Sequence, residues 1–255
     1  MSKIAPSRRW LADLRTAGTF LTVLPLGRGD EFRPGGLARA AWCFPLIGAL
    51  VGVVGGLVYA LVVWSGASPW LAATLCVATL VAITGGLHED GLGDFADALG
   101  GANRARRLAI MHDPRAGNFA VVALILLFAG RIGVLADLAT PERAGLALLA
   151  AAAASRGAVV VVMHLLPAAR GDGLSAGAGR PSSQGVAAAV LFCVLVAFLA
   201  LGPLVAAACL FGGALMAMIF AALAKRRLGG QTGDVLGAVQ LVAEFGCLTA
   251  ATMFA

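Results

Sequence analysis

The stretch AWCFPLIGALVGVVGGLVYALVVW, residues 41–64, carries no charged side chain and is long enough to cross a bilayer as one helix. Only Leu201-Gly202-Pro203 separates two later apolar runs, and a Gly-Pro pair is a natural place for a turn. The sequence therefore predicts an all-α, polytopic membrane protein with about seven transmembrane helices, with six or eight as alternatives. The apolar runs are 41–64, 70–86, 119–139, 144–166, 186–201, 204–223 and 235–255.

The composition agrees with this interpretation. Of the 255 residues, 60% are hydrophobic and 13% are charged, whereas a soluble domain carries about 25% charged residues. This excludes a disordered chain, a secreted disulfide scaffold and an ordinary water-soluble enzyme. The five cysteines lie inside apolar runs without a CxxC pair, which argues against metal binding by thiolates. We expect one membrane-embedded domain over 1–255, in which 1–40 is a cytoplasmic or interfacial segment and 10–26 forms an amphipathic surface helix.

Basic residues are distributed unevenly between the segments that join the apolar runs. Sixteen of the 19 Lys and Arg residues fall in the N-terminal segment and in 87–118, 167–185 and 224–234. The alternate connections contain only Arg143. Because basic loops stay in the cytoplasm, we expect a cytoplasmic N-terminus, an external C-terminus and a multi-pass location in the cytoplasmic (inner) membrane. The net charge of +6 then needs no nucleic-acid partner.

Acidic residues are concentrated in one block. Five of the 13 fall within 25 residues, beginning in GGLHEDGLGDFADALGG, residues 85–101. Asp90, Asp94 and Asp97 stand at i, i+4 and i+7, which places three carboxylates on one helix face. Such a face repels itself unless a cation neutralises it, and hard carboxylate ligands select Mg²⁺. The sequence therefore predicts a magnesium site at the membrane surface.

The neighbours of these aspartates extend the candidate site. Glu89 and His88 precede them and are placed to join the metal site or to support it. Gly91 and Gly93 are expected to let a large substrate approach closely. The alternative is a solvated acidic helix in a cytoplasmic loop, although the intervening residues are Gly, Leu, Phe and Ala rather than Lys and Glu.

A second polar block, MHDPRAGNFA (111–120), comes just before the third apolar run. Arg115 is suited to a phosphate or pyrophosphate. Asp113 is a candidate metal ligand, base or partner of His112. The alternative is that Asp113 only caps the next helix, with Pro114 at its first position.

A third block, GGQTGDVLGA (229–238), opens the last apolar run. Backbone N–H groups at a helix start form a ready site for an anion. Asp234, the acidic residue of the block, is expected to reach toward the acidic cluster. The alternative for the basic triplet that precedes the block, 225–227, is that it marks the cytoplasmic side of the membrane and does not bind phosphate.

Arg131, Arg156 and Glu244 are charged residues that lie well inside apolar runs. Such residues are costly in a membrane and are usually paired or functional. We expect Glu244 to pair with one of the two arginines.

These blocks carry a family resemblance. GGLHEDGLGDFADALGG (85–101), MHDPRAGNFA (111–120) and GGQTGDVLGA (229–238) resemble the hallmark blocks of the cobalamin synthase family, the adenosylcobinamide-GDP ribazoletransferases. FLTVLPLG (20–27) and FPLIGALVG (44–52) resemble the N-terminal blocks of that family. The resemblance covers nearly the whole chain in order.

The resemblance implies the last step of nucleotide-loop assembly in cobalamin biosynthesis. The α-ribazole nucleoside, or its 5′-phosphate, attacks the phosphate carried by adenosylcobinamide-GDP, so that GMP leaves and adenosylcobalamin or its 5′-phosphate forms. The implied cofactor is Mg²⁺, and the implied active site faces the cytoplasm. Homo-oligomers and association with other cobalamin-assembly enzymes are left open, as is the identity of the general base.

The expected site residues fall into three groups. The expected metal ligands are Glu89, Asp90, Asp94 and Asp97. The expected catalytic residues are Asp94, Asp113, Asp234 and His112. The expected substrate-binding residues are His88, Arg115, Gly117, Asn118, Gly230, Gln231, Thr232 and Gly233.

The alternatives are another Mg²⁺-dependent membrane transferase and a cation transporter. A CDP-alcohol phosphotransferase or an aromatic prenyltransferase also uses spaced aspartates and Mg²⁺ near a membrane surface. The first expects an Ala-Arg pair after Asp90-Gly91, which is missing, and the second expects two aspartate-rich motifs, of which one is clear. A cation transporter expects acidic residues near the bilayer midplane, where only Glu244 and Asp137 are candidates.

Overall fold

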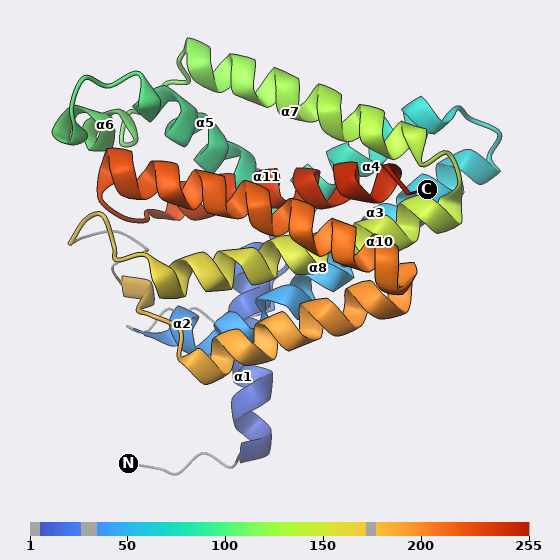
Figure 1. Ribbon diagram of the computed structural model, residues 1–255, viewed down its shortest axis with the longest axis horizontal. Helices are drawn as coiled ribbons and strands as arrows, with labels where there is room; N and C mark the ends of the chain where they lie inside the picture. Colours follow the sequence, from blue (N-terminus) through green and yellow to red (C-terminus); the bar gives the residue numbers. More distant parts are fainter. Residues whose placement is uncertain (1–5, 27–34, 172–176, 255) are drawn as a thin grey trace.

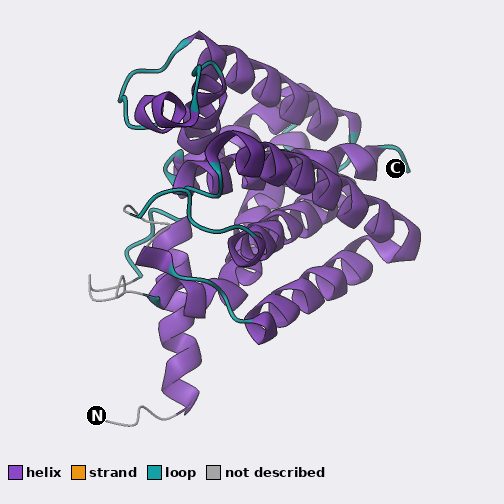
Figure 2. Cartoon of the chain, turned by 60° about the vertical axis from the view of Figure 1, so that its left-hand side comes forward, coloured by secondary structure: helices purple, strands orange, loops and turns teal. Residues whose placement is uncertain are grey.

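The computed structural model describes residues 6–26, 35–171 and 177–254, and these are helices joined by short connections (Figures 1 and 2). The only β pairing in the described ranges is an isolated bridge between Ala168 and Gln231. The all-α prediction is therefore confirmed. The helices are α1 (Pro6–Leu21), α2 (Gly36–Ala40), the 3-10 turn η1 (Ala41–Cys43), α3 (Phe44–Trp64), α4 (Pro69–Thr84), α5 (Leu87–Leu99), α6 (Arg104–Ile110), α7 (Asn118–Asp137), α8 (Pro141–Leu165), α10 (Ser183–Leu228) and α11 (Gly233–Thr252).

By length and composition, five described helical stretches are suited to cross a membrane, or six if α4 and α5 together form one bent span. That count takes α10 as one helix of 46 residues. The expected turn is nevertheless present, because Gly202 has φ 71° and ψ 171° and the two arms of α10 fold back beside each other there (Figure 1). The expected seven spans are reached only if the bent pair and both arms of α10 are counted.

The connection at 87–118 begins with helix α5, as the spacing of its aspartates predicts. Gly85 and Gly86 both adopt left-handed φ angles, 64° and 70°, between α4 and α5. These angles favour glycine, and they turn α5 by 90° from the axis of α4. The polar block therefore lies on a helix beyond the bend, packed against α7 and α11.

Glycines let the spans approach closely. Gly52 and Gly56 of α3 face α8, where an added Cβ would lie 2.6 Å from the Leu148 carbonyl oxygen and 2.9 Å from the Gly145 Cα. Small residues at four-residue spacing are a common means of packing membrane helices. Helices α3 and α8 therefore pack with their backbones in close contact.

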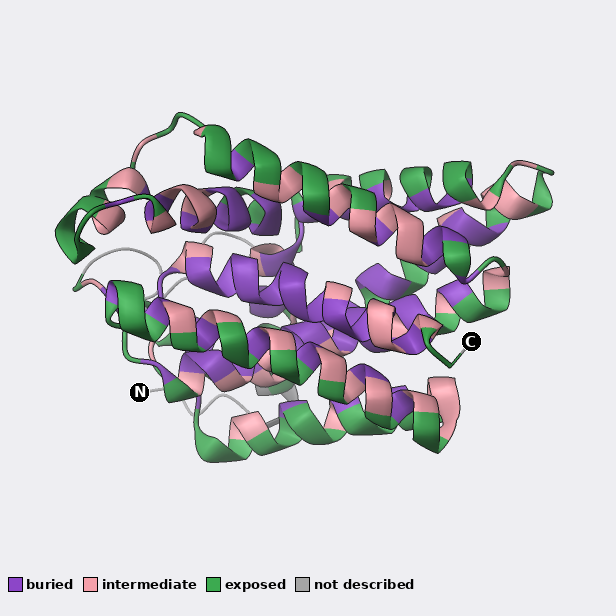
Figure 3. Ribbon diagram, turned by 45° about the horizontal axis from the view of Figure 1, so that its top comes forward, coloured by how far each residue is buried: buried purple, intermediate pink, exposed green. Residues whose placement is uncertain are grey.

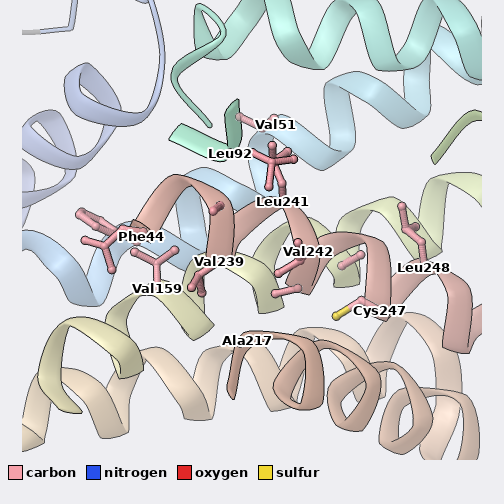
Figure 4. Packing of buried hydrophobic residues seen from close by; sticks show 14 of the residues in the cluster. Phe44, Val51, Leu92, Val159, Ala217, Val239, Leu241, Val242, Cys247 and Leu248 are labelled. Carbon is pink, nitrogen blue, oxygen red and sulfur yellow. The ribbon is translucent and has the colours of Figure 1, made fainter. Parts of the chain in front are cut away.

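Helices α8 and α11 occupy the centre of the bundle. Their most apolar stretches are 78% and 72% buried, against 17% for α10 and 28% for α7 (Figure 3). Val239, Leu241 and Leu248 of α11 contribute to the apolar core (Figure 4). The outer faces of α7 and α10 are apolar and exposed, as expected of surfaces that contact lipid.

Helix α1 runs across the long helices rather than along them (Figure 1) and is not among the candidate spans. Its Asp13 accepts hydrogen bonds from Arg39 Nε at 2.8 Å and from Trp42 Nε1 at 3.2 Å. These contacts hold α1 against α2 and η1.

Candidate functional site

The acidic side of α5 borders a cavity of about 880 Å³. The opposite wall comes from the connection between α6 and α7, including His112, Asp113 and Arg115. The first two polar blocks, separated in the sequence by a short helix, therefore meet around one cavity. From α5 the cavity receives Glu89, Asp90, Gly93 and Asp94.

Helix α11 adds a further carboxylate at this place. An added Cβ at Gly91 would lie 2.8 Å from the carbonyl oxygen of Asp234, so α5 and α11 touch backbone to backbone. The carboxyl group of Asp94 is close enough to interact electrostatically with those of Asp90, Asp234 and Asp97. The three blocks thus converge as expected. Gly91 was expected to let a large substrate approach closely. This expectation was wrong, because Gly91 instead lets α11 approach α5.

Asp97 is engaged by the start of α7. Its two carboxylate oxygens accept hydrogen bonds from Gly117 N at 2.6 Å and Ala120 N at 3.0 Å. These N–H groups are among those that a helix start leaves without an intrahelical partner. Gly117 is needed here because an added Cβ would lie 2.6 Å from Asp97 Oδ1. Asn118, the first residue of α7, is exposed.

Glu89 belongs to a buried charge network rather than to the aspartate face. Arg131 donates to Glu244 at 2.5 Å and approaches Glu89 at 3.4 Å, while Arg156 donates to Glu244 at 2.6 Å. Gln240 Nε2 donates to Glu244 at 2.8 Å. The expected pairing of Glu244 is confirmed, and it involves both arginines. Because its charge is already neutralised, Glu244 is a poor cation site for a transporter.

Arg115 and Asp113 bind each other at the rim of the large cavity. Arg115 donates through Nε at 2.9 Å and Nη2 at 2.8 Å, and its backbone N–H donates at 3.1 Å. These hydrogen bonds lower the pKa of Asp113 to about 2. Asp113 is therefore a weak base, and the Arg115 guanidinium remains at the solvent-facing rim.

Arg170 was not among the expected site residues, yet its side chain connects two of the blocks. Its guanidinium contacts His112 Nε2 through Nη1 and lies 3.6 Å from Asp234 Oδ2 through Nη2. The Arg170 side chain is 16% exposed. The only signal in the sequence was a basic residue in a polar loop, which is too common to single out a site.

The third block is held by its backbone. Gln231 N donates to the Pro167 carbonyl at 2.8 Å, and Ala169 N donates to the Gln231 carbonyl at 2.8 Å. Gly230 is pressed against the Pro167 carbonyl, leaving no room for a Cβ. Thr232 is buried and caps α11 by accepting from Val235 N at 3.2 Å. Four residues of the block, Gly233, Asp234, Leu236 and Gly237, line one cavity, and Gln231 lines another beside Pro167.

Arg104 fastens the same end of the bundle. It donates to the Leu228 carbonyl through Nε and to the Ala169 carbonyl through Nη2, both at 2.6 Å. The connections that carry most of the basic residues therefore lie together, beside the acidic cavity.

The donor chemistry of the site fits a hard divalent cation. Among the described residues, no basic side chain lies within ion-pair distance of Asp90 or Asp94, although both carboxylates border the cavity. Carboxylate oxygens are the ligands that Mg²⁺ prefers. The described side chains hold no group of three or more His, Cys, Asp or Glu residues already arranged around a metal position.

Comparison with known proteins identifies the family. The model of a family described as CobS, cobalamin-5-phosphate synthase, matches residues 13–252. The adenosylcobinamide-GDP ribazoletransferase of Bradyrhizobium diazoefficiens is 48% identical over 97% of this chain and 95% of its own. Proteins of the same name from Mesorhizobium japonicum and Azorhizobium caulinodans are 45% and 40% identical, each over at least 95% of its own length. No solved structure matches the chain. With three polar blocks gathered at one end of a helical bundle and a family match over nearly its whole length, the chain belongs to the CobS family of cobalamin-5-phosphate synthases.

Proposed function

We propose that this chain catalyses the reaction for which its relatives are named. It transfers the adenosylcobinamide-phosphate group of adenosylcobinamide-GDP to a ribose hydroxyl of α-ribazole or its 5′-phosphate. A phosphorus–oxygen bond to the ribose forms, the bond to the GMP phosphate breaks, and GMP leaves. The observation that carries this assignment is the family match together with one cavity that brings aspartates and Arg115 to face each other.

The cavity can position both reactants. Positioning and charge stabilisation supply most of the catalysis in phosphoryl transfer. Arg115 is exposed at the rim and can exchange Asp113 for phosphate oxygens of the incoming pyrophosphate. We assign substrate binding to Arg115 and its neighbour His112, which Arg170 contacts.

The hydroxyl proton needs a carboxylate acceptor. Asp113 is held in ion pairing with Arg115, and Asp97 is held by the N-terminus of α7. Of the expected catalytic carboxylates, Asp94 and Asp234 remain, and each interacts with neighbouring carboxylates. We assign proton acceptance to one of these two.

We further propose that Asp90, Asp94 and Asp234 hold Mg²⁺. The bound ion would supply charge neutralisation at the pyrophosphate and the leaving phosphate. Glu89 and Asp97, also expected as ligands, have other contacts, to Arg131 and to the α7 backbone.

The placement in the membrane is likewise a proposal. Basic connections gather at the end of the bundle that carries the acidic cavity. Because basic loops stay in the cytoplasm, this end and the N-terminus are assigned to the cytoplasmic side of the inner membrane, in one domain. Both substrates would then reach the site from the cytoplasm.

The test uses the purified protein in liposomes with adenosylcobinamide-GDP, α-ribazole and Mg²⁺. We expect a corrinoid product that contains the nucleoside, and one GMP for each product. Asp94→Asn should abolish turnover without loss of the folded protein. The control is Asp137→Asn, at the exposed far end of α7, which should keep wild-type activity. Absence of GMP from the wild-type reaction would overturn the assignment.

A further inference from the structure

A second cavity adjoins the first one on the other side of Asp90. It has a volume of about 190 Å³ and lies between α1, α2, α3, α5, α8 and α11. Most of its wall is apolar, with two aromatic rings, and the labelled residues Phe44 and Val159 lie close together in Figure 4. The apolar lining includes Phe20, Leu37, Phe44, Val159, Met163 and Leu236.

One buried polar residue is part of the lining of this apolar space. His88 lines the cavity and is only 4% exposed. Among the described residues, none forms a hydrogen bond with its imidazole ring. Its ring nitrogens are therefore available for a hydrogen bond to a molecule that enters the cavity.

The position of His88 is set by the same close helix contact that forms the candidate active site. An added Cβ at Gly237 of α11 would lie 3.2 Å from the His88 Cα. The imidazole is therefore held on a rigid crossing of α5 and α11. Such a crossing is a better platform for orienting a ligand than a loop would be.

The two cavities meet at the reacting groups. Asp90, Phe20 and Leu87 line both of them, and Asp234 lines the small one. A molecule in the small cavity would therefore have one end among apolar side chains and the other beside the carboxylates of the large cavity. The acceptor nucleoside has this character, because a flat apolar base is joined to a ribose that carries the attacking hydroxyl.

We propose that the small cavity binds the bicyclic aromatic base of the acceptor nucleoside, and that His88 donates a hydrogen bond to the free ring nitrogen of that base. This inference rests on the proposed function. The base carries its ribose on one ring nitrogen, and the other nitrogen has a lone pair in the ring plane. A neutral imidazole offers one N–H donor for it. The aromatic walls contact the ring faces, and the ribose lies at Asp90 and Asp234.

The first experiment changes the volume of the cavity. Val159→Phe fills it from α8, and Val159→Ala enlarges it. We expect Val159→Phe to raise the KM for α-ribazole about tenfold or more, the size of effect that one misfitting apolar group produces. The KM for adenosylcobinamide-GDP should stay unchanged. Val159→Ala should accept a nucleoside with a bulkier base better than the wild type does.

The matched control is Val122→Phe, which makes the same change on an exposed face of α7 and should leave both KM values unchanged. Equal shifts of both KM values in Val159→Phe, or no shift in either Val159 variant, would overturn the proposal. If a lipid chain fills the cavity, we expect no shift in either Val159 variant.

The second experiment tests the hydrogen bond. The riboside of indole lacks the free ring nitrogen of a benzimidazole but keeps the bicyclic shape. Wild-type protein should bind it about tenfold more weakly, the effect of one hydrogen bond. His88→Phe should bind the two ribosides equally, and His88→Gln should restore part of the preference. A preference that persists in His88→Phe would contradict the assignment of His88.

These affinities are measured by equilibrium dialysis of the nucleoside alone, so they do not depend on turnover. If the wild type binds the nucleoside with this pattern but makes no product, the proposed function fails and the cavity assignment stands. If it makes product and shows no such pattern, the cavity assignment fails alone.

Discussion

Asp97 and Gly117 are joined by a hydrogen bond of 2.6 Å from the Gly117 N–H to Asp97 Oδ2. The second oxygen of the same carboxylate accepts from Ala120 N at 3.0 Å. The third aspartate of the acidic block therefore holds the connection that carries Arg115 against α5. Asp90 and Asp94 differ from Asp97 because they border the large cavity and have no such partners within the described part of the chain.

Asp97→Ala should consequently act on stability more than on metal affinity. Loss of a charged acceptor leaves two backbone N–H groups of α7 unpaired, at a cost of about 2 kcal/mol. We expect a lower midpoint of thermal unfolding in detergent and a Mg²⁺ concentration dependence close to that of the wild type. Asp94→Ala is the matched variant and should show the reverse pattern. Mg²⁺ affinity is measured by titrating the ion into each purified variant without substrates. A loss of Mg²⁺ affinity in Asp97→Ala as large as that in Asp94→Ala would make Asp97 a ligand after all.

Much of this arrangement could be predicted from the sequence, because it depends on local pattern. The apolar runs mark the long helices, and the break at Leu201-Gly202-Pro203 marks the reversal in α10. The pairing of Glu244 also follows from elementary electrostatics, since a carboxylate inside an apolar run needs a cation. The gathering of three polar blocks was expected because each one begins or ends an apolar run.

Other features depend on contacts that no local pattern contains. Spacing places Asp97 on the face of Asp90 and Asp94, but its partners lie 20 and 23 residues away. Glu89 is drawn to Arg131, 42 residues away. The bend between α4 and α5 arises from Gly85 and Gly86, which adopt left-handed φ angles at the end of the apolar run 70–86. Tertiary packing decides each of these, and so spacing alone could not predict the partners of Asp97 and Glu89.

The contact between Gly91 and Asp234 predicts a sensitive position. In Gly91→Ala, the new Cβ would lie 2.8 Å from the Asp234 carbonyl oxygen, so α5 and α11 must move apart. Displacement of catalytic groups by about 1 Å can cost 100-fold in rate, and we expect a loss in kcat of that order. Gly133→Ala on α7 is the control, because nothing lies within 4 Å of its added Cβ. Both are assayed as purified protein, and similar kcat values for the two variants would contradict this reading.

The buried network makes Glu244 a stability residue. Glu244→Ala leaves Arg131 and Arg156 buried with fewer partners, and breaking such a pair costs about 3–5 kcal/mol. We expect a large fall in folded yield and in the unfolding midpoint in detergent. Glu142→Ala, an exposed carboxylate in the first turn of α8, should change stability by less than about 0.5 kcal/mol. A Glu244→Ala protein with the wild-type midpoint would show that the network contributes nothing.

The pairing of Asp113 with Arg115 predicts how activity depends on pH. Arg115 lowers the pKa of Asp113 to about 2 from its ordinary value of 3.8. A lowered pKa means that the carboxylate gains its proton only as the pH falls through about 2, so Asp113 stays ionised throughout the range from about pH 5 to 9. Any acid-side loss of kcat/KM in that range must come from another group, and Asp113→Asn should leave the position of that loss unchanged. The same variant releases Arg115 from its partner. The KM for adenosylcobinamide-GDP should therefore change, while the pH at which kcat/KM falls on the acid side should not. Profiles of kcat/KM from pH 5 to 9 for the wild type and Asp113→Asn decide the matter, because an acid-side inflection that disappears in the variant would make Asp113 the titrating base.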